Sequence, residues 1–299
     1  MQNLRVLALM PHPDDIEILC AGTLIRLKSL GCELHFATMT PGDKGSVVLG
    51  RTEIAAVRRE EARRSADVAG AKSFTCLEFA DLEIVFDNES RRCVAGLLRR
   101  IDPDIVFTTP PVDYMYDHEI TSKLVRDACF NAAVRNYSTE GLAAPSGKIP
   151  HLFYSDPIGG DNLFGTPIMP HILVDISTEI ERKTEMLACH ESQRSWLRKQ
   201  HGMDDYIESM RRSAKERGAI AGMEYAEGFR QHLGHPYPTD NPLLELVGAV
   251  EIEKGRVGEG DPGSSPTRGE ERATPSCSDC GAKRMKLESE RSGQPGEVR

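Results

Sequence analysis

Apolar residues along the first two thirds of the chain follow two alternating spacings. Short, nearly continuous apolar runs are typical of strands that are buried on both faces of a sheet. Longer segments with apolar residues every three to four positions are typical of amphipathic helices. The predicted strands cover residues 4–10, 32–40, 73–79, 104–111, 151–157 and 171–177. The predicted helices cover residues 15–31, 51–71, 90–101, 118–134 and 178–192.

This alternation of strands and helices predicts the fold class. Strands separated by helices form parallel pairs, and the connecting helices cover the sheet. We therefore expect an α/β fold, a Rossmann-like three-layer sandwich with a mainly parallel sheet and helices on both faces.

The last third of the chain predicts one more helix and a tail. Residues 202–229 have the pattern of a long helical stretch, interrupted near Gly218 and Gly222. From about residue 250 the chain is rich in Gly, Pro, Ser and charged residues and has almost no apolar ones. Such a segment cannot bury enough surface to offset the entropy lost on ordering. We predict one domain over residues 1–248 and a disordered polar tail over 249–299.

Composition and charge exclude several classes of protein. The net charge of −9 disfavours nucleic acid as a partner. The longest apolar runs fall short of the roughly 20 residues that span a bilayer, and the first residues lack the pattern of a signal peptide. Six of the eight cysteines are scattered through apolar segments, as expected of reduced thiols. The sequence predicts a cytoplasmic protein without a membrane span.

Two loops rich in His and Asp follow the first and fourth predicted strands. His12, Asp14 and Asp15 come after the first strand, and Asp117 and His118 come after the fourth. In an open parallel sheet, ligands bind beyond the carboxyl ends of the strands, where the strand order reverses. If the order is 3-2-1-4, the two strands are neighbours and the two loops meet.

These residues predict a metal site. His12 and Asp15 are three positions apart at the start of a helix and can share a face, and His118 adds a second imidazole. Two His and one acid form the ligand set of hydrolytic zinc sites and also of non-haem iron sites. Asp14 is then free to act as a general base, and Asp117 is a candidate partner that fixes the His118 tautomer.

Structural interpretations of the same residues compete with this one. Asp14 is a favoured helix N-cap residue, and His12 fits an ordinary loop histidine. A dinucleotide site is disfavoured, because the first strand-helix turn lacks G-x-G-x-x-G and carries acids.

Several motifs resemble one known family. The stretch H-P-D-D-x-E-I-x-x-x-G-T-L at 12–24 resembles the opening motif of the PIG-L/LmbE family of zinc-dependent N-acetylglucosaminyl deacetylases. T-P-G-D-K-G-S at 40–46 and R-x-x-E-A at 58–62 are similar to later segments of that family. Asp117-His118 matches the end of its H-P-D-H motif, and residues 175–193 resemble its C-terminal segment. The resemblance covers about residues 4–235.

The resemblance implies roles for individual residues. It implies that the metal ligands are His12, Asp15 and His118, that the general base is Asp14, and that Arg58 binds substrate. Met115 and Tyr116 stand where the family often has His and Pro of H-P-D-H, which leaves the second catalytic group open. Candidates for that group or for substrate contacts share a polar side chain on or near the expected pocket: Asp43, Tyr114, Tyr116, Asp117 and His190.

The implied reaction is hydrolysis of the acetamide of an N-acetylglucosamine-type sugar or glycoconjugate, giving a free amine and acetate, with Zn²⁺ or another divalent metal such as Fe²⁺. One alternative is a metal amidase acting on a thiol conjugate or an N-acyl antibiotic. Another is a non-catalytic binding member of the family. The expected partner is a small-molecule sugar or glycoconjugate, and the sequence leaves a homo-oligomer open.

Overall fold

The structure, a computed structural model, describes residues 4–139, 143–194 and 206–252. The strands are β1 (Arg5–Met10), β2 (Glu33–Thr38), β3 (Ser73–Cys76), β4 (Ile105–Thr108), β5 (His151–Ser155), β6 (Ile172–Asp175), β7 (Ala226–Gln231) and β8 (Val250–Glu251). The helices are α1 (Asp15–Leu19), α2 (Ala21–Ser29), α3 (Arg51–Ala69), α4 (Asn88–Ile101), α5 (Tyr116–Asn131), α6 (Ile180–Ala188), α8 (Tyr206–Ile220) and α9 (Pro242–Val247).

The eight strands form a single sheet in the order β3-β2-β1-β4-β5-β7-β6-β8. The pairs from β3 to β5 are parallel, and β7, β6 and β8 add antiparallel pairs at the other side. The order 3-2-1-4 that was assumed above is thus the one observed, and β1 and β4 are neighbours. The strand order reverses at this pair, because β2 and β3 are added on one side of β1 and β4 is added on the other. Such a point is where α/β folds place their ligands.

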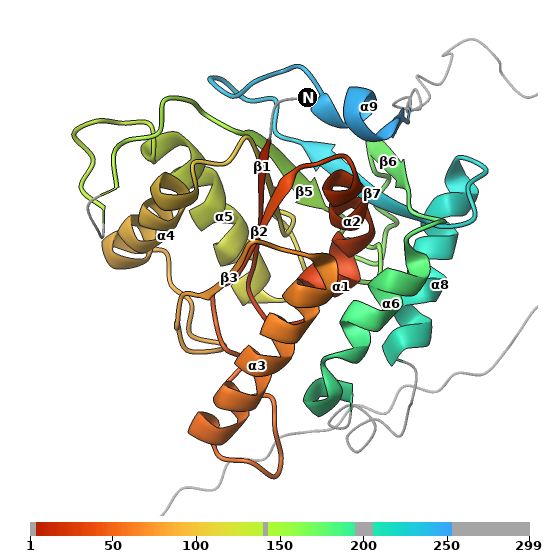
Figure 1. Ribbon diagram of the computed structural model, residues 1–299, viewed down its shortest axis with the longest axis horizontal. Helices are drawn as coiled ribbons and strands as arrows, with labels where there is room; N and C mark the ends of the chain where they lie inside the picture. Colours follow the sequence, from red (N-terminus) through yellow and green to blue (C-terminus); the bar gives the residue numbers. More distant parts are fainter. Residues whose placement is uncertain (1–3, 140–142, 195–205, 253–299) are drawn as a thin grey trace, which may run out of the picture. The chain divides into compact units, whose positions relative to one another are not determined.

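Alternate residues of β1 enter two hydrophobic cores, as the two-residue period of a strand requires. Val6, Ala8 and Met10 pack into one core with α1, α2, α3 and α6. Leu7 and Leu9 pack into the other with α4 and α5. Figure 1 shows these two groups of helices on opposite faces of the sheet. The predicted α/β sandwich with a mainly parallel sheet is confirmed.

The prediction of one long helix over residues 202–229 is wrong in its second half. Within the described residues, α8 ends at Ile220, and Ala226–Gln231 form strand β7 inside the sheet. The sequence AEGFRQ hides this strand, because Glu227 is buried through an ion pair with Lys183 rather than through an apolar side chain. Gly228 also leaves room for Asp156, whose Oδ2 would lie 2.1 Å from an added Cβ.

Smaller differences concern the first helix and the end of the domain. The helix predicted over 15–31 is divided at Cys20 into α1 and α2. Helix α9 and strand β8 are additional elements, and β8 pairs with β6 two residues beyond the predicted domain boundary at 248. The predicted tail from residue 253 onward lies outside the described residues. Among the described helices, none is both long and apolar enough to cross a bilayer.

Candidate metal centre and active site

The loops after β1 and β4 meet, as the strand order requires. The two strands pair in parallel, so their carboxyl ends lie at the same edge of the sheet. The ring centroids of His12 and His118 are 5.4 Å apart, and Asp15 lies between the two loops. The three predicted metal-ligating residues are thus brought together, and all three are buried.

His118 has one ring nitrogen held and the other free. Its Nδ1 lies 3.0 Å from Asp113 Oδ2. Its Nε2 is buried and has no hydrogen-bond partner among the described residues, and it lies 3.6 Å from Asp15 Oδ1. A neutral imidazole that donates its Nδ1 proton to Asp113 presents a lone pair at Nε2. The unpartnered nitrogen is therefore a ready metal ligand.

His12 is arranged in the same way from the opposite side. Its Nε2 faces two carboxylates, Asp81 Oδ1 at 3.0 Å and Asp117 Oδ2 at 3.2 Å. Its Nδ1 lies 3.3 Å from Asp15 Oδ2, and its backbone N–H donates to that same oxygen at 2.8 Å. A proton on Nε2 can be donated to the carboxylates of Asp81 and Asp117. The lone pair of Nδ1 then points toward the side where Asp15 lies.

The donor set fits a divalent metal ion. One ligand atom from each of His12, Asp15 and His118 lies within 4.8 Å of the other two. Each imidazole has an outer carboxylate on its second nitrogen, which is how proteins orient metal-bound histidines. Two imidazole nitrogens and one carboxylate suit Zn²⁺ and also Fe²⁺. A second close group consists of His12, Asp81 and Asp117. We do not assign a metal to it, because both carboxylates face His12 Nε2, the nitrogen that carries the proton in the arrangement above.

The electrostatics of the three residues agree with this assignment. Burial lowers the pKa of His12 and of His118, but the neighbouring carboxylates outweigh burial and leave both pKa values above the ordinary one. Burial raises the pKa of Asp15, but His118 and His12 outweigh it and leave that pKa lowered. A lowered pKa favours the ionised form of Asp15, which is the form that binds a cation.

Asp14 lines the pocket, and its side chain does not cap a helix. It occupies the N-cap position of α1 with φ 101°, yet its side chain makes no capping hydrogen bond. Tyr206 donates a hydrogen bond to its Oδ2 at 2.5 Å. Burial and the adjacent charge of Asp15 raise the pKa of Asp14 to about 6, against the opposing effects of Arg58, His190 and Tyr206. The capping interpretation of this side chain is therefore wrong.

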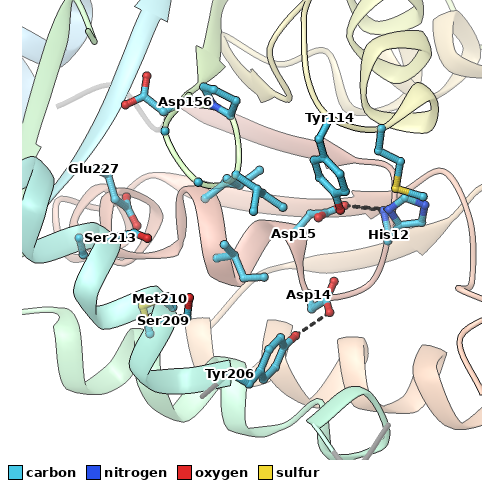
Figure 2. A pocket seen from close by; sticks show the side chains of 18 of the residues that line it. His12, Asp14, Asp15, Tyr114, Asp156, Tyr206, Ser209, Met210, Ser213 and Glu227 are labelled. Carbon is cyan, nitrogen blue, oxygen red and sulfur yellow. Dashed lines mark hydrogen bonds and ion pairs between the residues drawn. The ribbon is translucent and has the colours of Figure 1, made fainter. Parts of the chain in front are cut away.

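His12, Asp14 and Asp15 line a pocket of about 980 Å³, and His118 is fully buried beside them. Figure 2 shows His12, Asp14 and Asp15 at one end, with Tyr114 above them and α8 along one side. The lining residues come mainly from the loops after β1, β2, β3, β4 and β5 and from α3 and α8, and include Arg58, Met115, Asp156, Tyr206, Ser209 and Ser213.

The remaining predicted residues divide between the pocket and its surroundings. Arg58 lines the pocket, is buried, and donates to the Gly42 carbonyl at 3.1 Å. Tyr114 also lines it and packs edge-on against His118, with ring centroids 5.3 Å apart. Asp117 contacts His12, and it also accepts a hydrogen bond from the Leu82 backbone N–H. The predicted pairing of Asp117 with His118 is thus wrong, because Asp113 takes that place.

Five predicted residues lie outside the pocket lining: His118 and Asp117, described above, and Asp43, Tyr116 and His190. Asp43 accepts hydrogen bonds from the Asp81 backbone and the Arg51 side chain, and so supports the loop that carries Asp81. Tyr116 is 77% exposed. His190 is buried behind Asp14, with its Nε2 3.2 Å from Glu17 Oε1. The predicted catalytic or substrate-binding roles of Asp43, Tyr116 and His190 stay predictions.

Sequence reasoning missed Asp81, Asp113 and Tyr206. Asp113 was within reach, because it belongs to the same polar loop as His118. Asp81 follows the third strand, whose carboxyl end lies two strands away from that of β1. Tyr206 is 192 residues from Asp14, and no spacing rule connects the two.

The fold and the site together define an α/β protein with a His/Asp/His group that can hold a metal ion at the point where the strand order reverses. The sequence profile described as PIG-L, GlcNAc-PI de-N-acetylase, matches residues 7–129. A diacetylchitobiose deacetylase from Thermococcus kodakarensis is 31% identical over 232 residues, which are 76% of this chain and 82% of the relative. The chain belongs to the PIG-L family.

Two further relatives agree with this membership. A Bacillus anthracis protein described as probable N-acetyl-alpha-D-glucosaminyl L-malate deacetylase 2 is 25% identical over 202 residues, which are 64% of this chain and 83% of the relative. The solved N,N'-diacetylchitobiose deacetylase from Pyrococcus horikoshii superposes with a TM-score of 0.67 at 28% identity, covering 82% of this chain and 90% of that one.

Proposed function

We propose that this chain is a metal-dependent N-deacetylase. Its substrate is an N-acetylglucosamine-type sugar or glycoconjugate, and the products are the free amine and acetate. Membership of the PIG-L family supports the reaction, and the names of the two curated relatives above support the substrate class.

One observation carries the proposal. His12 and His118 each have one ring nitrogen bound to an outer carboxylate and the other nitrogen facing Asp15, with Asp14 beside them. A purely structural cluster would have no reason to leave His118 Nε2 buried without a partner, because such a nitrogen loses its hydration. A metal ion at this point satisfies it.

The roles of the chain's own residues follow from their places. When bound, Zn²⁺ or Fe²⁺ polarises the amide carbonyl and makes water a better nucleophile at neutral pH. Asp14 accepts a proton from the attacking water and returns it to the leaving amine nitrogen. Asp113, Asp81 and Asp117 hold the two imidazoles in the required tautomers.

Tyr114 is the residue that we assign as hydrogen-bond donor to the amide carbonyl, in addition to the metal. Met115 lines the pocket and its thioether has no hydrogen to donate, so it cannot replace the histidine of H-P-D-H. Tyr114 lines the pocket next to His118, whereas Tyr116 does not line it. We assign Tyr114 to the acyl oxygen and Arg58 to hydroxyl groups of the sugar.

The length of the pocket favours a substrate larger than one sugar ring. Tyr206, Ser209, Ser213 and Arg217 line the pocket from one side of α8. Eleven positions along a helix correspond to about 16 Å. The N-acetylated sugar then lies at the Asp14 end, and the group attached to it lies along α8.

The test is acetate release by the purified protein of known metal content. The panel contains N-acetylglucosamine, N,N'-diacetylchitobiose, N-acetylglucosaminyl malate, an N-acetylglucosaminyl thiol conjugate and an N-acyl glycopeptide. We expect equal amounts of acetate and free amine from at least one glycoside, and none from a chelator-treated sample until metal is restored.

Other results would favour the alternatives. Release from the N-acyl glycopeptide alone would indicate an amidase of different specificity. Saturable binding of a glycoside without any acetate release at full metal loading would indicate a binding protein and refute the proposal.

A further inference from the structure

Tyr206 lines the pocket, but it does not come from the loops after β1 and β4, which carry His12, Asp15 and His118. It is the first residue of α8, and its hydroxyl donates a hydrogen bond to Asp14 Oδ2 at 2.5 Å (Figure 2). Its ring packs against the core that α1, α2 and α6 share. The side chain is thus fixed at both ends, by apolar packing of the ring and by the bond to Asp14.

The orientation of the Asp14 carboxylate is not set by its own helix. Its backbone is in the left-handed region, and its side chain makes no bond to the start of α1. Three charged groups act on Asp14: Asp15 with a like charge, and Arg58 and His190 with opposite charges. Electrostatic attraction and repulsion do not by themselves select one rotation of a carboxylate. The short, directional hydrogen bond from Tyr206 to Oδ2 does select one.

We infer that Tyr206 is a positioning residue for the base, holding Asp14 Oδ2 so that Oδ1 is the oxygen that takes the proton of the attacking water. The inference rests on the proposed hydrolysis. Water gives a proton to Oδ1 as its oxygen bonds to the acyl carbon. That proton passes to the amine nitrogen as the C–N bond breaks, and the Tyr206 hydroxyl keeps its own proton throughout. Burial and the Asp14 carboxylate raise the pKa of Tyr206, which keeps the phenol protonated.

This assignment gives α8 a role in the reaction as well as in the pocket wall. Residues 7–129 match the family profile, whereas Tyr206 comes from a helix far beyond that range. The position of the base therefore depends on how α8 packs, and α8 also lines the part of the pocket where the rest of the substrate lies.

Tyr206→Phe tests the inference, because it removes one hydroxyl and keeps the ring. We expect kcat to fall about 10- to 100-fold, the cost of a misplaced catalytic group, with KM nearly unchanged and a full equivalent of metal retained. The matched control is Tyr237→Phe. That hydroxyl donates to the Arg126 carbonyl, and its ring packs in the other core. The control should lose some stability and keep wild-type kcat.

A double-mutant cycle separates action through Asp14 from direct action on the substrate. In an Asp14→Asn background, adding Tyr206→Phe should change kcat by less than about twofold, because the group that Tyr206 positions has already lost its function. Independent multiplication of the two effects would refute the positioning role, and so would a Tyr206→Phe enzyme with wild-type kcat.

Crystal structures of the metal-loaded wild type and Tyr206→Phe give a readout that needs no substrate. We expect the Asp14 carboxylate to rotate in the variant while His12, Asp15 and His118 stay in place. An unmoved Asp14 would overturn the inference even if the protein is an active deacetylase. If the wild type releases no acetate from any substrate, the proposed function fails, and this structural comparison still decides whether Tyr206 positions Asp14.

Discussion

Replacing Asp14 by Asn should make the protein more stable and much less active. Asp14 is buried next to Asp15, and its pKa is raised from 3.8 to about 6. When the pKa of a carboxyl is higher in the folded state than in the unfolded state, the free energy of unfolding falls as the pH rises from the lower pKa to the higher one. For Asp14 this interval runs from about pH 4 to about pH 6, and the full loss of stability applies above it. A shift of about two units corresponds to about 3 kcal/mol. Asn keeps the shape and can still accept the Tyr206 hydrogen bond, but it carries no charge.

The measurement is thermal or denaturant unfolding of the metal-free proteins between pH 3.5 and 8. Asp14→Asn should exceed the wild type by up to about 3 kcal/mol at pH 7.5, and the two curves should converge below pH 4. Turnover of the metal-loaded variant should fall about 10²- to 10⁴-fold, as expected on removal of a general base. Metal content should stay at one equivalent, because Asp14 is not among the proposed ligands.

Asp81→Asn is the matched control, since it makes the same change at a neighbouring carboxylate. Burial raises the pKa of Asp81, but His12 outweighs it and the pKa is lowered. This control should therefore destabilise the metal-free protein at pH 7.5. An Asp14→Asn protein that melts no higher than the wild type at pH 7.5 would show that the burial argument is wrong, and wild-type turnover in that variant would show that Asp14 is not the base.

Other consequences of the site can be measured in the same preparations. His12→Ala or His118→Ala should lose tight zinc binding, because two remaining ligands hold a metal poorly; a full equivalent after dialysis would disprove the ligand set. Asp113→Asn should weaken metal affinity about 10- to 100-fold by releasing the His118 ring, measured by competition with a chromophoric chelator, and unchanged affinity would contradict the role of Asp113. A chain that ends at residue 252 should keep the activity and melting temperature of the full chain, and a large fall in either would show that residues 253–299 support the domain.

The sequence predicted the part of the site that local spacing controls. His12, Asp14 and Asp15 follow a strand at once, and the strand order that makes His118 their neighbour is the common one for this fold. Asp113 and Asp117 could not be told apart, because their directions depend on where α5 begins. The structure starts α5 at Tyr116, so Asp117 and His118 lie on successive positions of the helix and face different groups.

The contributions from the last third of the chain could not be predicted in this way. Strand β7 contains a buried Glu227 whose cost is offset by Lys183 and by the backbone N–H groups of Gly22 and Thr23. A pattern of apolar residues does not show such a strand, since its burial depends on partners from other elements. Tyr206 was missed for the same reason, because its function comes from a contact formed only in the folded chain.

The place of β7 in the sheet has a consequence for how the chain folds as it leaves the ribosome. Strand β6 is made about 50 residues before β7, yet its neighbours in the sheet are β7 and β8, and β7 separates it from β5. The parallel part from β3 to β5 can form while synthesis continues, because its strands and helices come first. Strand β6 must wait, with its edge unpaired, until residue 231 has emerged. The Lys183–Glu227 pair also closes only then, so the nascent chain contains both ligand loops well before it has a finished pocket.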